Sequence, residues 1–64
     1  MEKPYRIHVT DISKAIYFLE KELIPAREEG TGIRITISNQ TIAHVILYLN
    51  AKEIVVYDVE EVIV

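Results

Sequence analysis

Two histidines, His8 and His44, are the side chains of this 64-residue sequence whose ordinary pKa lies closest to neutral pH. They lie on separate predicted segments, and nothing in the sequence brings them together. With Asp58 nearby they could ligate a metal ion or act as a base, but a metal site requires a closer set of ligands than these residues provide. We therefore expect two partly exposed histidines and no metal site.

The other residue types that could take part in catalysis also fit structural roles. The adjacent carboxylates Glu28-Glu29 and Glu60-Glu61 fall in predicted polar turns, where they would be solvated rather than tuned for acid–base work. Ser13 suits a helix cap, and no cysteine or Gly-x-Ser-x-Gly motif is present. The loop 30–32 precedes a strand, whereas phosphate-binding glycine loops precede a helix. We expect no catalytic residue and no cofactor, and we keep an enzyme with a site between subunits as the third hypothesis.

Tyr5, Arg6 and His8 could contact nucleic acid, because aromatic and basic strand residues stack on and pair with exposed bases. Binding to the phosphate backbone requires clustered Lys and Arg. Only Lys3 and Arg34 would join them, and the chain has seven Lys and Arg against ten Asp and Glu, a net charge of −3. The composition argues against nucleic acid, which stays as the alternative function.

The elements that must position these residues predict an α+β fold. In residues 5–10, apolar and polar side chains alternate as in a half-buried strand. In residues 12–24, apolar residues recur at helical spacing behind the capping candidates Asp11 and Ser13, and Pro25 ends the helix. Residues 26–29 could add one further helical turn before Gly30.

Strands are expected to make up most of the second half. Residues 33–38 alternate clearly, and 53–57 is a further strand, followed by a turn over 58–61 and a short last strand over 62–64. The segment 41–49 fits either a strand or a helix, and its β-branched and aromatic residues favour the strand. The favoured order is β-α-β-β-β, one helix on a mostly antiparallel sheet, with β-α-β-α-β as the alternative. We expect a single domain over 1–64 without an internal repeat.

A strand at 41–49 would leave apolar side chains on the sheet face opposite the helix. Because an exposed apolar patch usually marks an interaction site, we predict a two-fold self-association surface there. The alternative is that the C-terminal segment or the 25–31 loop of the same chain covers this face. The candidate interface residues are Ile42, His44, Ile46, Tyr48, Val55 and Tyr57.

Size and composition support self-association. Domains shorter than about 70–80 residues usually need disulfides, a metal or oligomerisation for stability, and this sequence has no cysteine. No apolar run is long enough to span a membrane, and a cytoplasmic location is the simplest interpretation. The sequence therefore predicts a non-enzymatic, self-associating protein-interaction module. A homodimer is the favoured assembly, and the sequence does not identify the protein partner.

Overall fold

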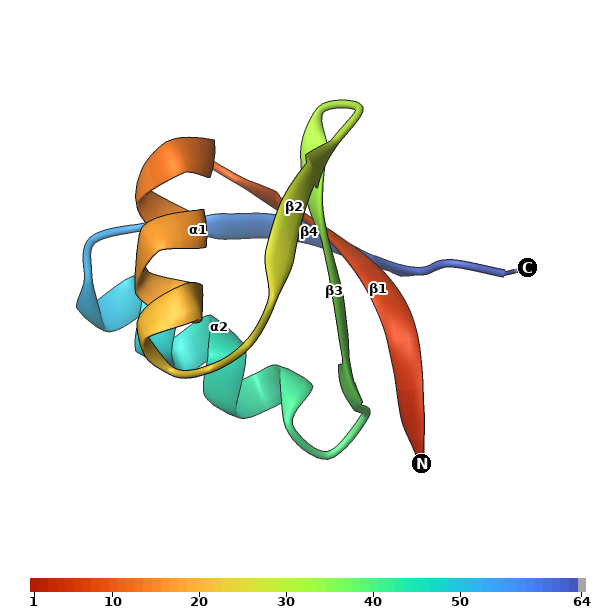
Figure 1. Ribbon diagram of the computed structural model, residues 1–64. Coiled ribbons are helices and arrows are strands. Elements are labelled where there is room, and N and C mark those ends of the chain that lie inside the picture. Colours follow the sequence, from red (N-terminus) through yellow and green to blue (C-terminus); the bar gives the residue numbers. More distant parts are fainter. Residues whose placement is uncertain (64) are drawn as a thin grey trace.

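The computed structural model describes residues 1–63, which form one antiparallel sheet and two helices that cover the same sheet face (Figure 1). The elements are β1 (Glu2–Val9), α1 (Ile12–Lys21), β2 (Ala26–Glu29), β3 (Gly32–Ser38), α2 (Ile42–Ala51) and β4 (Val56–Glu61). The strand order across the sheet is β2-β3-β1-β4, with every neighbouring pair antiparallel. This order, two interleaved β-α-β units, is the ferredoxin-like topology.

The α+β class with a mostly antiparallel sheet is confirmed, but the single-helix order β-α-β-β-β is wrong. Residues 42–51 form α2, because Val45 and Leu49 stand on one helix face and bury against the sheet. The β-preference of Val and Ile is weak and depends on context. Here the sheet already holds β1 between β3 and β4, and its covered face needs a second helix beside α1.

Three shorter predictions are also corrected. Residues 26–29 form strand β2 instead of a helical turn, since the antiparallel hairpin with β3 extends their backbone. Residues 58–61 belong to β4, where β1 supplies their pairing partners. The expected last strand does not form at Val62 and Ile63, although the Val62 N–H still donates to the Pro4 carbonyl at 2.9 Å, and residue 64 lies outside the described residues.

A single apolar core lies between the sheet and both helices. Alternate residues of β1 and β3 point into it, as their alternating sequence predicted. It is continued by Ile54, which follows α2. The buried set is Tyr5, Ile7, Val9, Ala15, Leu19, Ile33, Ile35, Ile37, Val45, Leu49 and Ile54.

The two halves of the chain repeat at a spacing of 30 residues, which corrects our expectation of no repeat. The pairs with identical residues in the first β-α units are Ile7/Ile37, Ile12/Ile42, Ile16/Ile46, Leu19/Leu49 and Ile24/Ile54. Across the helix pair, the equivalent aromatics Phe18 and Tyr48 meet edge-on with ring centroids 6.4 Å apart. The Tyr48 hydroxyl also donates to the Phe18 carbonyl at 3.0 Å. Equivalent positions therefore occupy equivalent places in the core.

Candidate functional site

The sheet face that the helices leave uncovered carries all three arginines of the chain. Arg27, Arg34 and Arg6 stand side by side on β2, β3 and β1, because Arg27 pairs with Arg34 and Arg34 pairs with Arg6 in the strand register. Glu60 on β4 ends the row opposite Arg6. Like charges in directly opposed strand positions repel each other, so this row requires a counter-charge.

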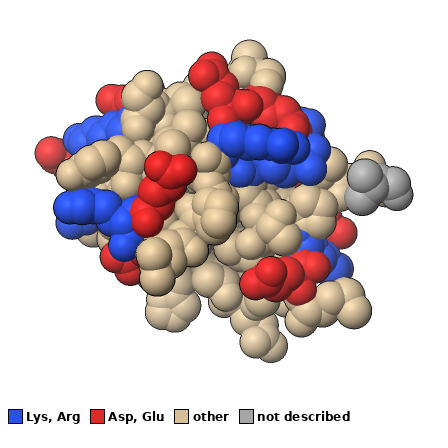
Figure 2. Space-filling view, in the orientation of Figure 1, with Lys and Arg blue, Asp and Glu red and all other residues tan. Residues whose placement is uncertain are grey.

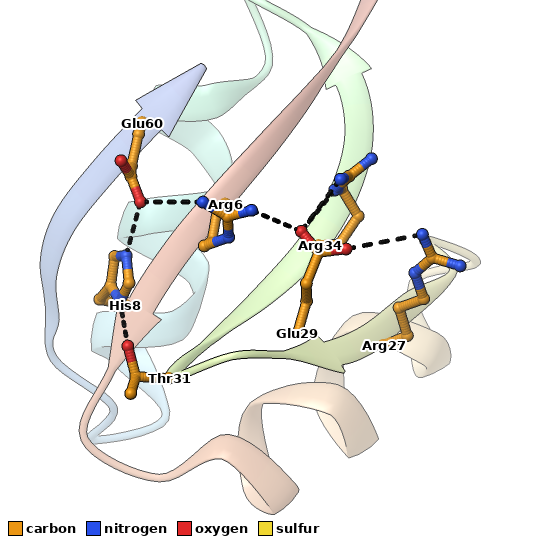
Figure 3. A network of polar contacts seen from close by, with 7 residues as sticks. All are labelled: Arg6, His8, Arg27, Glu29, Thr31, Arg34 and Glu60. Carbon is orange, nitrogen blue, oxygen red and sulfur yellow. Dashed lines mark hydrogen bonds and ion pairs between the residues drawn. The ribbon is translucent and has the colours of Figure 1, made fainter. Parts of the chain in front are cut away.

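Glu29, at the end of β2, supplies that counter-charge to all three arginines (Figure 3). Its Oε2 accepts from Arg6 Nη2 at 2.7 Å and from Arg34 at 3.1 Å for Nε and 2.9 Å for Nη2. Its Oε1 lies 3.6 Å from Arg27 Nη2. One carboxylate thus ties three strands together.

A second carboxylate, Glu60, connects Arg6 to His8. Glu60 Oε1 lies 3.3 Å from Arg6 Nη1 and 3.0 Å from His8 Nε2 (Figure 3). An ionised carboxylate only accepts hydrogen bonds, so His8 Nε2 carries a hydrogen. In the neutral ring, His8 Nδ1 then accepts from the Thr31 hydroxyl at 3.5 Å.

Glycine at position 32 makes room for this network. A Cβ at this position would lie 2.6 Å from the Ile7 carbonyl oxygen, which is a steric clash. It would also lie 3.0 Å from Arg6 Cγ and 3.2 Å from His8 Cε1, closer than an ordinary van der Waals contact. Gly32 therefore lets Arg6 and His8 lie across β3 toward the β2–β3 turn.

These contacts shift the ionisation of the network toward the charged forms. The hydrogen bond from Arg6, reinforced by Arg34, lowers the pKa of Glu29 below its ordinary value of 4.5. The hydrogen bond from His8, followed by that from Arg6, lowers the pKa of Glu60. Hydrogen bonds to Glu29 and Glu60 raise the pKa of Arg6 above its already high ordinary value.

The candidate nucleic-acid residues do not share one surface. Arg6 and His8 lie on the uncovered face, where both contact Glu60. Tyr5 points to the opposite side, into the core, and is 6% exposed. Side chains alternate along a strand, so the same alternation that predicted the strand already separates Tyr5 from its two neighbours. The structure brings Arg27 and Glu29 to Arg6 instead. The sequence signal that we missed was a strand at 26–29 that the turn at Gly30-Thr31 connects to the next strand.

The candidate interface residues are also divided. The expected position of Ile42, His44, Ile46 and Tyr48 on the uncovered sheet face is wrong, since all four lie on α2 on the covered side. His44 is exposed there. Val55 precedes β4, and the Tyr57 ring lies beside His8 with centroids 6.1 Å apart. Whether any of these residues contacts a partner stays a prediction.

The solvent side of α2 forms a second candidate site, because it carries no charge. None of the ten residues Ile42–Ala51 is Asp, Glu, Lys or Arg. Leu47 is 67% exposed at the centre of the helix. Figure 2 shows mostly uncharged side chains over the lower part of the view, where Figure 1 places α2, with separate groups of charged side chains to the left and right of them.

Two hollows adjoin these surfaces. The first, of about 280 Å³, lies between the end of α1 and the first turns of α2 and is lined by Glu22, Ile24, Thr41, His44, Val45 and Tyr48. The second, of about 560 Å³, lies at the β2–β3 side of the uncovered face and is lined by Glu2, Pro25, Ala26, Arg27, Arg34, Ile35 and Thr36.

Within residues 1–63, no group of three His, Asp or Glu side chains is arranged to hold a metal ion. His8 and His44 lie on opposite sides of the sheet, on β1 and α2. Neither described helix is long and apolar enough to cross a membrane. Comparison of the chain with protein-family models, with curated proteins and with solved structures finds no match.

Proposed function

We propose that this protein is a non-enzymatic protein-interaction module that self-associates through the solvent side of α2. The observation that carries the proposal is the absence of charge from all ten residues of this helix. A helix at the surface of a protein normally presents charged residues to water, whereas the exposed residues of α2 are Ala43, His44, Leu47, Asn50 and Ala51. The other helix meets this expectation, since α1 presents Lys14, Glu20 and Lys21 outward.

A second copy of the chain is the occupant that the shape of this side favours. Leu47 projects from α2, and the 280 Å³ hollow on the same helix is lined in part by His44, three residues before Leu47, and by Tyr48, the residue after it. In a two-fold dimer the same patch meets itself. Leu47 of each copy would then enter the hollow of the other copy, so that both hollows of the dimer are filled.

The β4 edge, one of the two free edges of the sheet, is a poorer route to a dimer. β4 is an edge strand that carries Asp58, Glu60 and Glu61. Antiparallel pairing of two β4 strands would oppose acidic residues of the two copies, and charged side chains on an edge are a device that prevents such pairing. The charges on β4 therefore favour the helix surface over this edge.

The expected dimer is weak. A standard interface buries about 800 Å² per partner, which would be about a fifth of the 4240 Å² surface of the chain. The exposed side of one ten-residue helix supplies only part of that area. The neighbouring Leu23, which is 89% exposed at the end of α1, would have to contribute.

Sedimentation velocity tests the proposal between about 10 μM and about 1 mM, the range in which a weak dimer dissociates. We expect the sedimentation coefficient of the wild type to rise with concentration and that of Leu47→Glu to stay at the monomer value. Tyr17→Glu is the matched control, because Tyr17 occupies the equivalent position of α1 and is 57% exposed. A wild type that remains monomeric at the highest concentration, or a loss of association in Tyr17→Glu alone, would contradict the proposal.

Nucleic-acid binding remains the second function to test, because three arginines gather on the uncovered face. Two observations weaken it: Tyr5 is buried, and Arg6 is engaged by two carboxylates. Affinity for nucleic acid depends steeply on salt. A single-stranded oligonucleotide that binds tightly at low salt and is released by added salt would favour this function over self-association.

The enzyme hypothesis placed a site between subunits, and within one copy the nearest arrangement to a catalytic series is Thr31, His8 and Glu60, whose contacts follow the order nucleophile, base and orienting acid. Both hollows described above are lined by other residues, so neither places a substrate beside Thr31. We therefore expect hydrolysis of an activated ester to be the same for the wild type and for Thr31→Ala. A loss of hydrolysis in Thr31→Ala would restore the enzyme hypothesis.

A further inference from the structure

The arginine row on the uncovered face holds more positive charge than its carboxylates neutralise. Arg6, Arg27 and Arg34 contribute three positive charges, and Glu29 and Glu60 contribute two negative ones. The row belongs to a chain whose net charge is −3. The row itself therefore carries an excess of one positive charge, opposite in sign to the charge of the molecule, and Glu2 and Asp58 lie on the same face outside the row.

Two of the three arginines have donors to spare. A guanidinium group carries five N–H donors. Arg34 directs Nε and Nη2 toward Glu29, and among residues 1–63 its Nη1 has no hydrogen-bond partner. The Arg27 side chain is 70% exposed, and its one ionic contact within the described part of the chain, to Glu29, is 3.6 Å long.

The 560 Å³ hollow lies where these donors are available. Arg27 and Arg34 line it, together with Thr36, which follows Arg34 on the same face two residues along β3. The hollow exists because the chain leaves the sheet at Pro25, so that β2 pairs with β3 only as far as Ile35. Its volume lies within the range of small-molecule sites.

We propose that this hollow is a binding site for a compact oxyanion, a carboxylate or phosphate group of a small molecule, held by Arg27 and Arg34 with the Thr36 hydroxyl as a further donor. Guanidinium groups match both oxyanions through paired N–H donors. Glu29 shows the chemistry within the molecule, since its carboxylate already lies against the same arginines.

The surroundings select a small anion over an extended one. Glu2 lines the same hollow, and Asp58 and Glu60 lie across the uncovered face on β4. A long polyanion such as a nucleic acid would run along this face and meet these carboxylates, whereas one compact group meets only the arginine side. The proposal is independent of the self-association of α2, which lies on the other side of the sheet.

Titration of the ¹⁵N-labelled chain followed by ¹H–¹⁵N NMR tests the site, with inorganic phosphate and succinate as the two probes. We expect saturable shifts of the Arg27 and Arg34 Nε–H signals and of the Thr36 amide. The stronger of the two probes identifies phosphate or carboxylate as the preferred group. Saturable shifts confined to other residues, or no saturation up to about 50 mM of either probe, would overturn the proposal.

Arg27→Gln is the first variant, because Arg27 is exposed and its removal leaves the Glu29 contacts to Arg6 and Arg34 in place. Loss of one charge-assisted contact should weaken binding about tenfold. Lys14→Gln removes the same charge from α1 and should leave the affinity unchanged. An equal loss in both variants would show attraction to overall charge and no site.

Glu29→Gln provides an opposite test. It removes the carboxylate that competes for Arg34 and Arg27, so the affinity for phosphate or succinate should increase severalfold. A decreased affinity in this variant, with the fold intact by NMR, would overturn the proposal. Binding of an oligonucleotide more tightly than either small probe, at the same salt concentration, would also overturn it in favour of a polyanion site.

Discussion

The two β-α units of this protein share a core and differ in their surfaces. Leu19 and Leu49 occupy equivalent positions at 0% exposure, and Ala15 and Val45, one turn earlier, are both buried. On the solvent side, α1 is charged and α2 is not. The constraint from packing is the same in both halves, so the difference between the helices marks where a requirement other than folding acts.

The helix ends show the same division into common and particular features. Both helices end in a Schellman motif: the Ile24 N–H donates to Leu19 O and the Ile54 N–H to Leu49 O, each at 3.0 Å. The starts differ. Asp11 caps α1 by accepting the Lys14 N–H at 3.0 Å, whereas Thr41 makes no side-chain cap at α2.

The largest expected effect tests the shared core. Leu19→Ala and Leu49→Ala should each lower the free energy of unfolding by about 2–5 kcal/mol, because each removes a fully buried side chain and leaves a cavity. In a chain of this size either change approaches the whole stability. Urea unfolding followed by circular dichroism measures both. A cost below about 1 kcal/mol for one of the two would break the equivalence of the halves.

The helix starts predict an intermediate and unequal effect. Asp11→Ala should cost about 1 kcal/mol of unfolding free energy, since it removes an N-cap hydrogen bond. Thr41→Ala should stay within about 0.5 kcal/mol, because the cap it would remove is absent. The same urea measurement compares the two variants, and equal costs would contradict the difference between the helix starts.

The helix ends predict a smaller, stabilising effect that is the same in both halves. Leu23 and Glu53 have φ angles of 61° and 65°, the left-handed region that favours glycine. Leu23→Gly and Glu53→Gly should each raise the free energy of unfolding by about 0.5 kcal/mol, because relief of backbone strain exceeds the added flexibility of the unfolded chain. Differential scanning calorimetry should show a higher Tm for both, and a lower Tm for either would show that the side chain at that position is needed.

Sequence patterns predicted most of the secondary structure in the first half of the chain and less of it in the second half, for physical reasons. Residues 12–24 combine charged and apolar residues, and the resulting stripe predicts a helix. Residues 42–51 lack charge, so helical and strand spacing fit them equally well. The property that marks α2 as a candidate interface is therefore the property that concealed its secondary structure. The 30-residue repeat was the signal that could have resolved it, because Ile42, Ile46 and Leu49 repeat three positions of the predicted helix.

The candidate site could be predicted only in part, because it depends on pairing between distant strands. Alternation correctly placed Arg6, His8 and Arg34 opposite the apolar side chains of their strands. The register that aligns Arg27 with Arg34, and Arg34 with Arg6, follows from the hairpin at Gly30-Thr31 and from the sheet order.

The helix ends were also hard to predict, because no glycine marks them. Leu23 and Glu53 take the left-handed positions at which glycine is usual.

The smallest expected effect concerns the two carboxylates of the arginine row, one from each half. Contacts lower the pKa of both Glu29 and Glu60 in the folded state, so the folded chain binds fewer protons than the unfolded chain in acid. Their contribution to stability is therefore complete above the ordinary glutamate pKa of 4.5 and is lost as the pH falls through the lowered values. Both groups are partly exposed, and solvent screening keeps the effect modest.

Glu29→Gln and Glu60→Gln should each lower the Tm slightly near neutral pH, where the carboxylate contribution is complete, and approach the wild type in acid, so that the acid limb of a plot of Tm against pH is flatter. Glu29 accepts from Arg6 and Arg34 and has Arg27 nearby, whereas Glu60 contacts Arg6 and His8. We expect Glu29→Gln to flatten the limb more, because permanently charged guanidinium groups surround its carboxylate. Glu28→Gln, on the same strand but outside the network, is the matched control. A steeper acid limb in either network variant would reverse the sign argued here, and equal flattening in Glu28→Gln would assign the effect to overall charge rather than to the arginine row.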